Sequence, residues 1–290
     1  MLVFFCGLLV LGCAEKAEDT ALPIVMEESN NVLIVMDDEL WLGALGDSVR
    51  SYLAVEVPGV RPPEPMFSLN HLTPSMFKGG VKKFRNVILF NNQSSASHFK
   101  YLPEQYAKDQ VYFDLESDSN EVLMEYFLKH AIEIRNKIYY AEISLIQKQI
   151  KSRKQHSPQL LLDRFDMQLD VPSIFEVKVQ EDDFIWFKKE RASGSIGLLV
   201  YAVDKSQVME EGEVVIERVY AVRDSISGKY IHSTEEGAYV EMIDYFEDLK
   251  VNRHINGVEI MESFGSWDMK NSFMGGTTLT YIFEDTVGGR

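Results

Sequence analysis

Acidic residues that directly follow an apolar run are the first candidates for chemistry. Asp37 and Asp38 follow the run at 31–36, and Trp41 comes shortly after them. Such a pair can hold Mg²⁺ for phosphoryl transfer when a further aspartate ends a later central strand, but that strand here ends in Asn91-Asn92. We therefore interpret these carboxylates as stabilising the N-terminal dipole of a following helix. Asp37, Asp38 and Trp41 are kept as candidate ligand-binding residues.

A second candidate group lies near the end of the sequence, where Trp267 and Asp268 precede Gly275 and Gly276. These residues could line a binding cleft, since glycines allow close approach of the backbone. The favoured alternative is a hairpin with Trp267 in the core. Asp268 would also join Asp37 and Asp38 if the protein were a carboxylate-dependent hydrolase, although no spacing connects the three.

No other motif predicts catalysis. The six histidines are scattered without HxH or HExxH spacing, and the GxSxG, P-loop and GxGxxG patterns do not occur. We therefore predict no catalytic residue, no metal site and no cofactor.

A cysteine near the start carries the most specific chemistry. Val10-Leu11-Gly12-Cys13 ends an uncharged leader and is typical of a bacterial lipobox, in which Cys13 is lipidated and residues 1–12 are removed. The leader is shorter than the roughly 20 residues that span a bilayer, and it has the apolar core and small cleavage residue of a signal peptide. No Lys or Arg precedes that core. An ordinary signal peptide and a buried helix are the alternatives.

An acidic tether is predicted at 13–30. Within it, Lys16, Ala17, Glu18 and Asp19 resemble the acidic signal that sends some Bacteroidota lipoproteins to the cell surface. A solvated linker is the alternative. With Cys6 removed and Cys13 lipidated, the mature chain would hold no free thiol, which excludes an internal disulfide and a cysteine nucleophile.

Buried strands and one long helix are predicted in the first half, 31–170. Runs rich in β-branched and apolar residues predict strands at 31–36, 85–91 and 110–115. The segment 119–154 carries apolar residues at steps of three and four, which predicts a helix about 45 Å long. Asp118 and Glu121 suit its N-terminal capping box.

The second half, 171–290, has the pattern of an antiparallel α+β domain. A helix is predicted at 215–226 with Gly228 as its C-terminal cap. Strands are predicted at 173–179, 183–188, 196–201, 239–243, 254–264 and 277–283. The predicted fold class is α+β, with two α/β-sandwich-like halves, mostly antiparallel sheets and the long helix between them.

Composition limits the partners. Hydrophobic residues make up 46% and charged residues 26% of the chain, as in a globular protein with a core. The formal net charge of −16 repels phosphate backbones, so nucleic acid is not an expected partner.

Several stretches together resemble an uncharacterised Bacteroidota lipoprotein family that is known only as a domain of unknown function. The resemblance runs from about Val32 to the end and implies an envelope location, but no activity, ligand or catalytic residue. The second half also loosely resembles the PsbP/Mog1 arrangement. The stretches that carry the family resemblance are 35–41, 61–67, 183–186, 197–201, 223–225, 237–239 and 267–276.

The expected function is that of a lipid-anchored outer-membrane lipoprotein, exposed at the cell surface if the acidic signal is used. It would bind an envelope protein or ligand without catalysis, and a carboxylate-dependent envelope hydrolase is the alternative. The strand at 277–283 is followed by an acidic and glycine-rich turn without a returning strand. We therefore predict a truncated C-terminus, which leaves an unpaired strand edge and an apolar sheet face in the second half.

Overall fold

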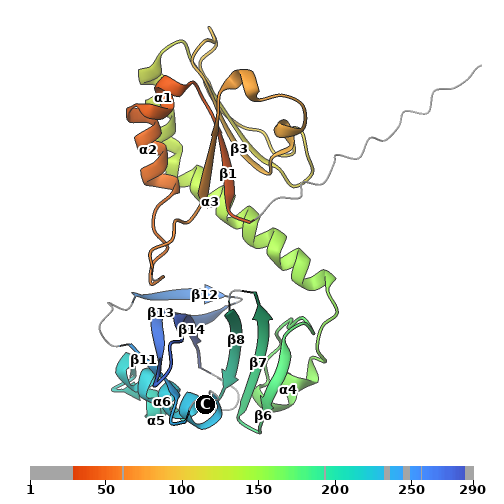
Figure 1. The fold of residues 1–290 in the computed structure, drawn as a ribbon, viewed down its shortest axis with the longest axis vertical. Helices are drawn as coiled ribbons and strands as arrows, with labels where there is room; N and C mark the ends of the chain where they lie inside the picture. Colours follow the sequence, from red (N-terminus) through yellow and green to blue (C-terminus); the bar gives the residue numbers. More distant parts are fainter. Residues whose placement is uncertain are drawn as a thin grey trace, which may run out of the picture.

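The computed structural model describes residues 29–60, 62–192, 194–231, 236–243, 249–255 and 257–284 (Figure 1). Cys13, the candidate export signal at 16–19 and the leader lie outside these residues. The chain forms two α+β domains with a long helix between them, which confirms the predicted fold class.

A five-stranded sheet forms the centre of the first domain. Its strands are β1 (Asn31–Val35), β2 (Ser68–Leu72), β3 (Asn86–Asn91), β4 (His98–Tyr101) and β5 (Val111–Glu116). In the order β2-β1-β3-β5-β4, the first four run parallel and the edge strand β4 runs antiparallel. The antiparallel β4 makes the sheet mixed. The parallel strands β1, β3 and β5 are covered on both faces, as is typical of parallel strands.

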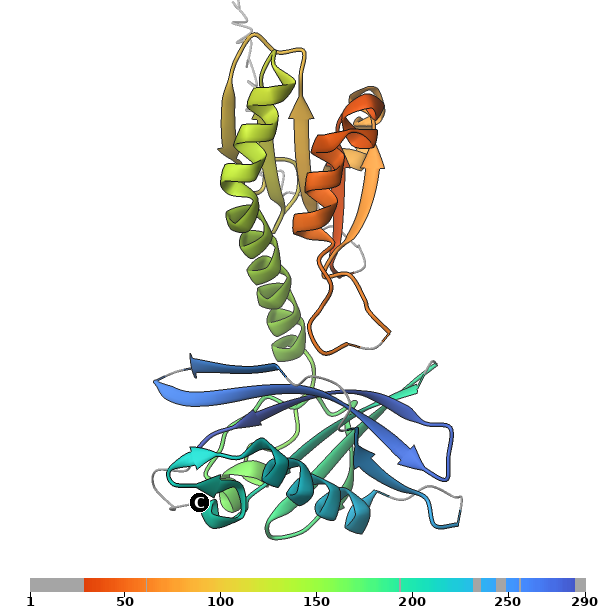
Figure 2. The same ribbon diagram turned by 90° about the vertical axis from the view of Figure 1, so that its left-hand side faces the viewer.

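Helices cover one face of this sheet, as Figure 2 shows. They are α1 (Asp38–Leu42), α2 (Ala44–Leu53) and α3 (Asn120–Ser152). Ile34, Phe113 and Phe127 belong to the core between these helices and the sheet, and all three are fully buried. The short 3₁₀ helices η1 (Pro74–Met76) and η2 (Gly79–Lys83) lie in the β2–β3 connection, where Phe77 packs with Tyr112 on the opposite face.

Helix α3 follows the predicted segment 119–154 closely, and its apolar stripe is buried from Leu123 to Ile138. The predicted capping residue is wrong by one position. Ser119 caps the helix, because its side chain accepts a hydrogen bond from the Val122 N–H. Beyond Glu142 the helix extends past the sheet toward the second domain (Figures 1 and 2).

The second domain begins with helix α4 (Gln159–Phe165) and a three-stranded antiparallel sheet. That sheet contains β6 (Glu176–Gln180), β7 (Phe184–Arg191) and β8 (Gly194–Tyr201), with β7 in the centre. Leu161 of α4 packs with Val171 and Ile185. The expected division between residues 170 and 171 falls within this cluster.

A second antiparallel sheet and one helix complete the domain. The sheet contains β11 (Tyr239–Met242), β12 (Leu249–Ile255), β13 (Val258–Lys270) and β14 (Gly275–Ile282). Strand β13 pairs with all three others, so the strand predicted at 254–264 is a hairpin. Helix α6 (Ile216–Tyr230) packs on this sheet and runs past Gly228, which is therefore not its C-terminal cap. The short α5 (Lys205–Val208), β9 (Met209–Glu210) and β10 (Glu213–Val214) precede it.

The two domains touch at the loop that follows α2. Gly59 has a positive φ of 73°, and a Cβ placed there would lie 2.6 Å from the Phe264 Cβ on β13. A glycine is required at this position because both the backbone conformation and the close approach exclude a side chain. Tyr139 of α3 lies near Tyr281 of β14. The pKa of the Tyr281 phenol is raised mainly by burial, and the charges of Glu262 and Tyr139 raise it further.

Candidate functional site

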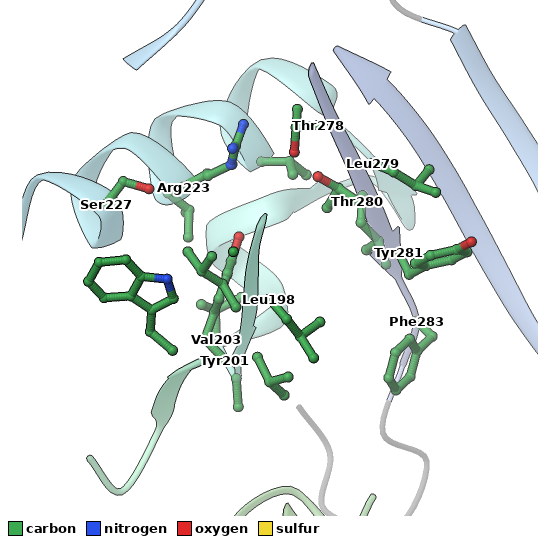
Figure 3. A pocket seen from close by; sticks show the side chains of 18 of the residues that line it. Leu198, Tyr201, Val203, Arg223, Ser227, Thr278, Leu279, Thr280, Tyr281 and Phe283 are labelled. Carbon is green, nitrogen blue, oxygen red and sulfur yellow. The ribbon is translucent and has the colours of Figure 1, made fainter. Parts of the chain in front are cut away.

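A cavity of about 2350 Å³ lies between the two sheets of the second domain. Strand β8 forms one wall, strand β14 forms another, and helix α6 contributes a third (Figure 3). Apolar and aromatic side chains predominate among the lining residues that Figure 3 labels, including Leu198, Tyr201 and Phe283. The cavity exceeds the 300–1,000 Å³ that is usual for small-molecule sites.

Two strands with an unpaired edge border this cavity. Among the described strands, β8 pairs only with β7 and β14 pairs only with β13. Alternation along β14 directs Leu279 and Tyr281, and Phe283 just beyond it, to one side and Thr278 and Thr280 to the other (Figure 3). The three apolar residues are 45%, 48% and 47% exposed. Free backbone edges and apolar side chains therefore occur together here.

Two buried polar atoms in the cavity wall have no hydrogen-bond partner among the described residues. They are the Ser227 Oγ on α6 and the Trp186 Nε1 on β7. Ser227 is only 1% exposed, so water does not easily replace a missing partner. Burying such groups without a partner costs about 1–3 kcal/mol each.

A positive charge lies in the same wall. Arg223 is one turn of α6 before Ser227 and contacts the Met242 Sδ (Figure 3). Desolvation lowers the pKa of Arg223, whereas Tyr201 and Asp224 oppose that shift. Burial raises the pKa of the Tyr201 phenol. The wall therefore offers a charged donor and a neutral hydroxyl beside apolar surface, which suits carbonyl or carboxylate oxygens.

The candidate residues near the C-terminus divide between core and cavity. Trp267, Gly275 and Gly276 line the cavity, whereas Asp268 does not. Gly276 lies opposite Trp267 in the hairpin, and a Cβ there would be 3.1 Å from the indole Nε1. The predicted hairpin is confirmed, and the partly buried Trp267 packs against α6 and β11 at the edge of the core while it also lines the cavity.

The candidate residues near the N-terminus lie in the other domain. Trp41 stacks on His71, with ring centroids 4.9 Å apart, and the Arg50 guanidinium lies 4.4 Å from the Trp41 ring centroid. The Asp38 Oδ1 is 3.9 Å from the His71 Nδ1. Asp37 occupies the N-cap position of α1 without a side-chain capping hydrogen bond. The hydrolase alternative thus finds no shared site, because Asp37 and Asp38 are in a different domain from Asp268.

Several cavity residues were not predicted as site residues. Trp186, Tyr201 and Arg223 belong to stretches that carried the family resemblance, at 183–186, 197–201 and 223–225. The resemblance was therefore the only signal that pointed to them. Ser227 had no signal in the sequence, since its importance depends on its burial.

Family models cover almost all of the chain. Residues 26–151 match the model described as Domain of unknown function (DUF8532). Residues 153–290 match the model described as Domain of unknown function (DUF4837). The chain joins two domains of unknown function. The DUF8532 domain contains the mixed sheet and α3, and the DUF4837 domain contains the cavity.

Other comparisons add no relative. No significant match was found among curated proteins or solved structures. No helix in the described part of the chain combines the length and apolar character that a membrane span requires.

Proposed function

We propose that this chain is a non-catalytic, lipid-anchored binding protein of the cell envelope. Its DUF4837 domain takes up an extended segment of a partner protein between strands β8 and β14. The observation that carries the proposal is the cavity bordered by β8 and β14, each of which has one edge without a partner strand in the described part of the chain. An inserted strand would hydrogen-bond to one or both edges, as in binding by β-strand addition.

The size and chemistry of the cavity favour a peptide segment over a small molecule. A volume of about 2350 Å³ suits a chain of several residues. The exposed apolar side chains of β14 can pack against alternate side chains of an added strand. Arg223 lines the cavity and can donate to carbonyl oxygens of that strand at the cavity wall.

The location rests on the N-terminal sequence. Val10-Leu11-Gly12-Cys13 supports lipidation of Cys13, and Lys16-Ala17-Glu18-Asp19 supports export to the outer surface of a Bacteroidota outer membrane. Partners would then be other proteins of the envelope. The net charge of −16 favours partners with basic residues around the inserted segment.

A synthetic peptide tests the binding mode. The probe is a ten-residue peptide that alternates threonine with valine and tyrosine, and its control carries N-methyl groups on every second residue. We expect the first peptide to bind and to slow amide hydrogen exchange in 194–201, in 275–282 or in both. The control should bind at least tenfold more weakly, because it cannot donate from one backbone edge.

Variants locate the binding surface. Leu279→Ser combined with Tyr281→Ser should weaken peptide binding about tenfold, while far-UV circular dichroism stays unchanged. Leu42→Ser serves as the matched control, since Leu42 is 79% exposed on α1 and remote from the cavity. Peptide binding without slower exchange in either strand would refute the proposal.

A further inference from the structure

Three potential metal ligands converge on one face of the DUF8532 sheet. His98 comes from β4, and Asp114 and Glu116 come from β5. The His98 Nε2 lies 3.4 Å from the Asp114 Oδ2, and the His98 Nδ1 lies 4.0 Å from the Glu116 Oε2. One ligand atom from each residue can be chosen so that all three lie within 4.8 Å of one another.

The strand pairing explains this arrangement. Strands β4 and β5 are antiparallel, with His98 directly opposite Glu116. Alternation along β5 directs Asp114 and Glu116 to one face, while Phe113 and Leu115 enter the core on the other. The site is also near the carboxyl end of a parallel strand, where ligands bind in open α/β sheets.

The surroundings of the two carboxylates differ: Asp114 has one oxygen without a described partner, whereas neighbouring side chains hold Glu116 in place. The Asp114 Oδ1 is buried and has no hydrogen-bond partner among the described residues. Glu116 accepts a hydrogen bond from the Ser94 Oγ at 2.8 Å, and its other oxygen lies 3.5 Å from the Asn91 Nδ2. Such outer contacts orient the ligands of metal sites. The three side chains are 16–22% exposed, so a cation can reach them.

We propose that His98, Asp114 and Glu116 bind one divalent transition-metal cation, with Zn²⁺ preferred over Mn²⁺. Two carboxylates balance the charge of the cation, and a neutral imidazole supplies the nitrogen ligand that suits these metals. Ligands that share Zn²⁺ tetrahedrally lie about 3.3 Å apart at the usual bond lengths. The His98–Asp114 distance already meets this value, and a rotation of Glu116 brings in the third ligand.

The competing explanation is an imidazolium held between two carboxylates. It needs no cation and predicts that added metal has no effect on His98. Zn²⁺ that binds here would displace any proton shared between the imidazole and a carboxylate, so a change at His98 under saturating Zn²⁺ distinguishes a metal site from a purely structural ion pair.

Calorimetry on the full chain, after treatment with a chelator, tests the site. We expect one equivalent of Zn²⁺ to bind, Mn²⁺ to bind more weakly and Mg²⁺ to bind weakest. Asp114→Asn and His98→Gln should each weaken Zn²⁺ binding at least tenfold. The control is His130→Gln, because His130 pairs with Glu133 at 2.9 Å on α3 outside the three-ligand group. This variant should keep the full stoichiometry.

A second measurement does not depend on variants that fold. The imidazole resonances of His98 should shift on addition of one equivalent of Zn²⁺ and broaden on addition of Mn²⁺. Unchanged His98 resonances at saturating Zn²⁺ would overturn the proposal, as would equal Zn²⁺ binding by the folded Asp114→Asn variant.

Discussion

Glu142 should be the least replaceable carboxylate of helix α3. Its side chain accepts hydrogen bonds from the Arg85 Nε at 2.7 Å, from the Asn86 Nδ2 at 2.7 Å and from the Asn30 backbone N–H at 3.0 Å. Glu142 is 1% exposed and Arg85 is 5% exposed. Glu142→Ala removes the carboxylate and leaves the buried guanidinium without this counter-charge.

The magnitude follows from that burial. Breaking a buried ion pair by removing one partner costs about 3–5 kcal/mol, out of a total of about 5–15 kcal/mol for a typical domain. For a domain of the size of 26–151, this corresponds to a decrease in Tm of about 10–20 °C. Replacing both partners in Arg85→Met/Glu142→Met should cost less than the sum of the two single changes, because the double variant leaves no unpaired charge.

Urea unfolding followed by circular dichroism measures these differences. Glu133→Ala is the matched control on the same helix, since the Glu133 side chain is 46% exposed and its pair with His130 should contribute less than about 1 kcal/mol. The reasoning fails if Glu142→Ala costs no more than this control. It also fails if the double variant loses the full sum of the single losses.

Three further predictions address the rest of the chain. Burial raises the pKa of Tyr112 well above its ordinary value of 10.0, so only the unfolded phenol ionises just above pH 10 and the free energy of unfolding should fall by about 1.4 kcal/mol per pH unit there. Urea titrations at pH 9 and pH 11 should show a smaller fall for Tyr112→Phe, and an equal fall would contradict this account. Gly59→Ala should separate the domains and increase the radius of gyration in X-ray scattering, whereas Gly212→Ala, with a φ of 90° and open space around it, should not. Cys13→Ser should abolish lipid labelling and release the protein from the membrane fraction, because the acyl chains hold it there; an unlabelled variant that stays in that fraction would mean that the leader itself is the anchor.

Local patterns were sufficient to predict most of the fold. The buried strands at 31–36 and 85–91 and the stripe from Leu123 to Ile138 depend on residue type and period alone, and the structure confirms them. Two predictions that were wrong concern the cap residues of helices, where adjacent residues in the sequence suit the same position. Ser119 and Asp118 can both cap a helix, and Gly228 can lie inside a helix when packing outweighs its low helix propensity.

The candidate sites were harder to predict because they depend on distant pairings. His98 meets Glu116 only through the register of β4 and β5, so no spacing motif for metal ligands detects them. The weak signal was Asp114 on the strand predicted at 110–115, with Glu116 directly after it at the spacing that places both on one face. The cavity likewise depends on two sheets that stay apart, and sequence patterns within each strand do not encode that gap.

Helix α3 also determines the length of the connection between the two domains and the place where the N-terminal part of the described chain joins it. Its 33 residues span about 50 Å. Asn30 is bonded to Glu142, about 33 Å along this axis from the helix start, so the described chain enters the molecule close to the waist between its domains (Figure 1). If a membrane anchor lies upstream, the protein would pivot about this waist. The DUF4837 cavity and the far edge of the DUF8532 sheet would then move in opposite directions relative to the membrane.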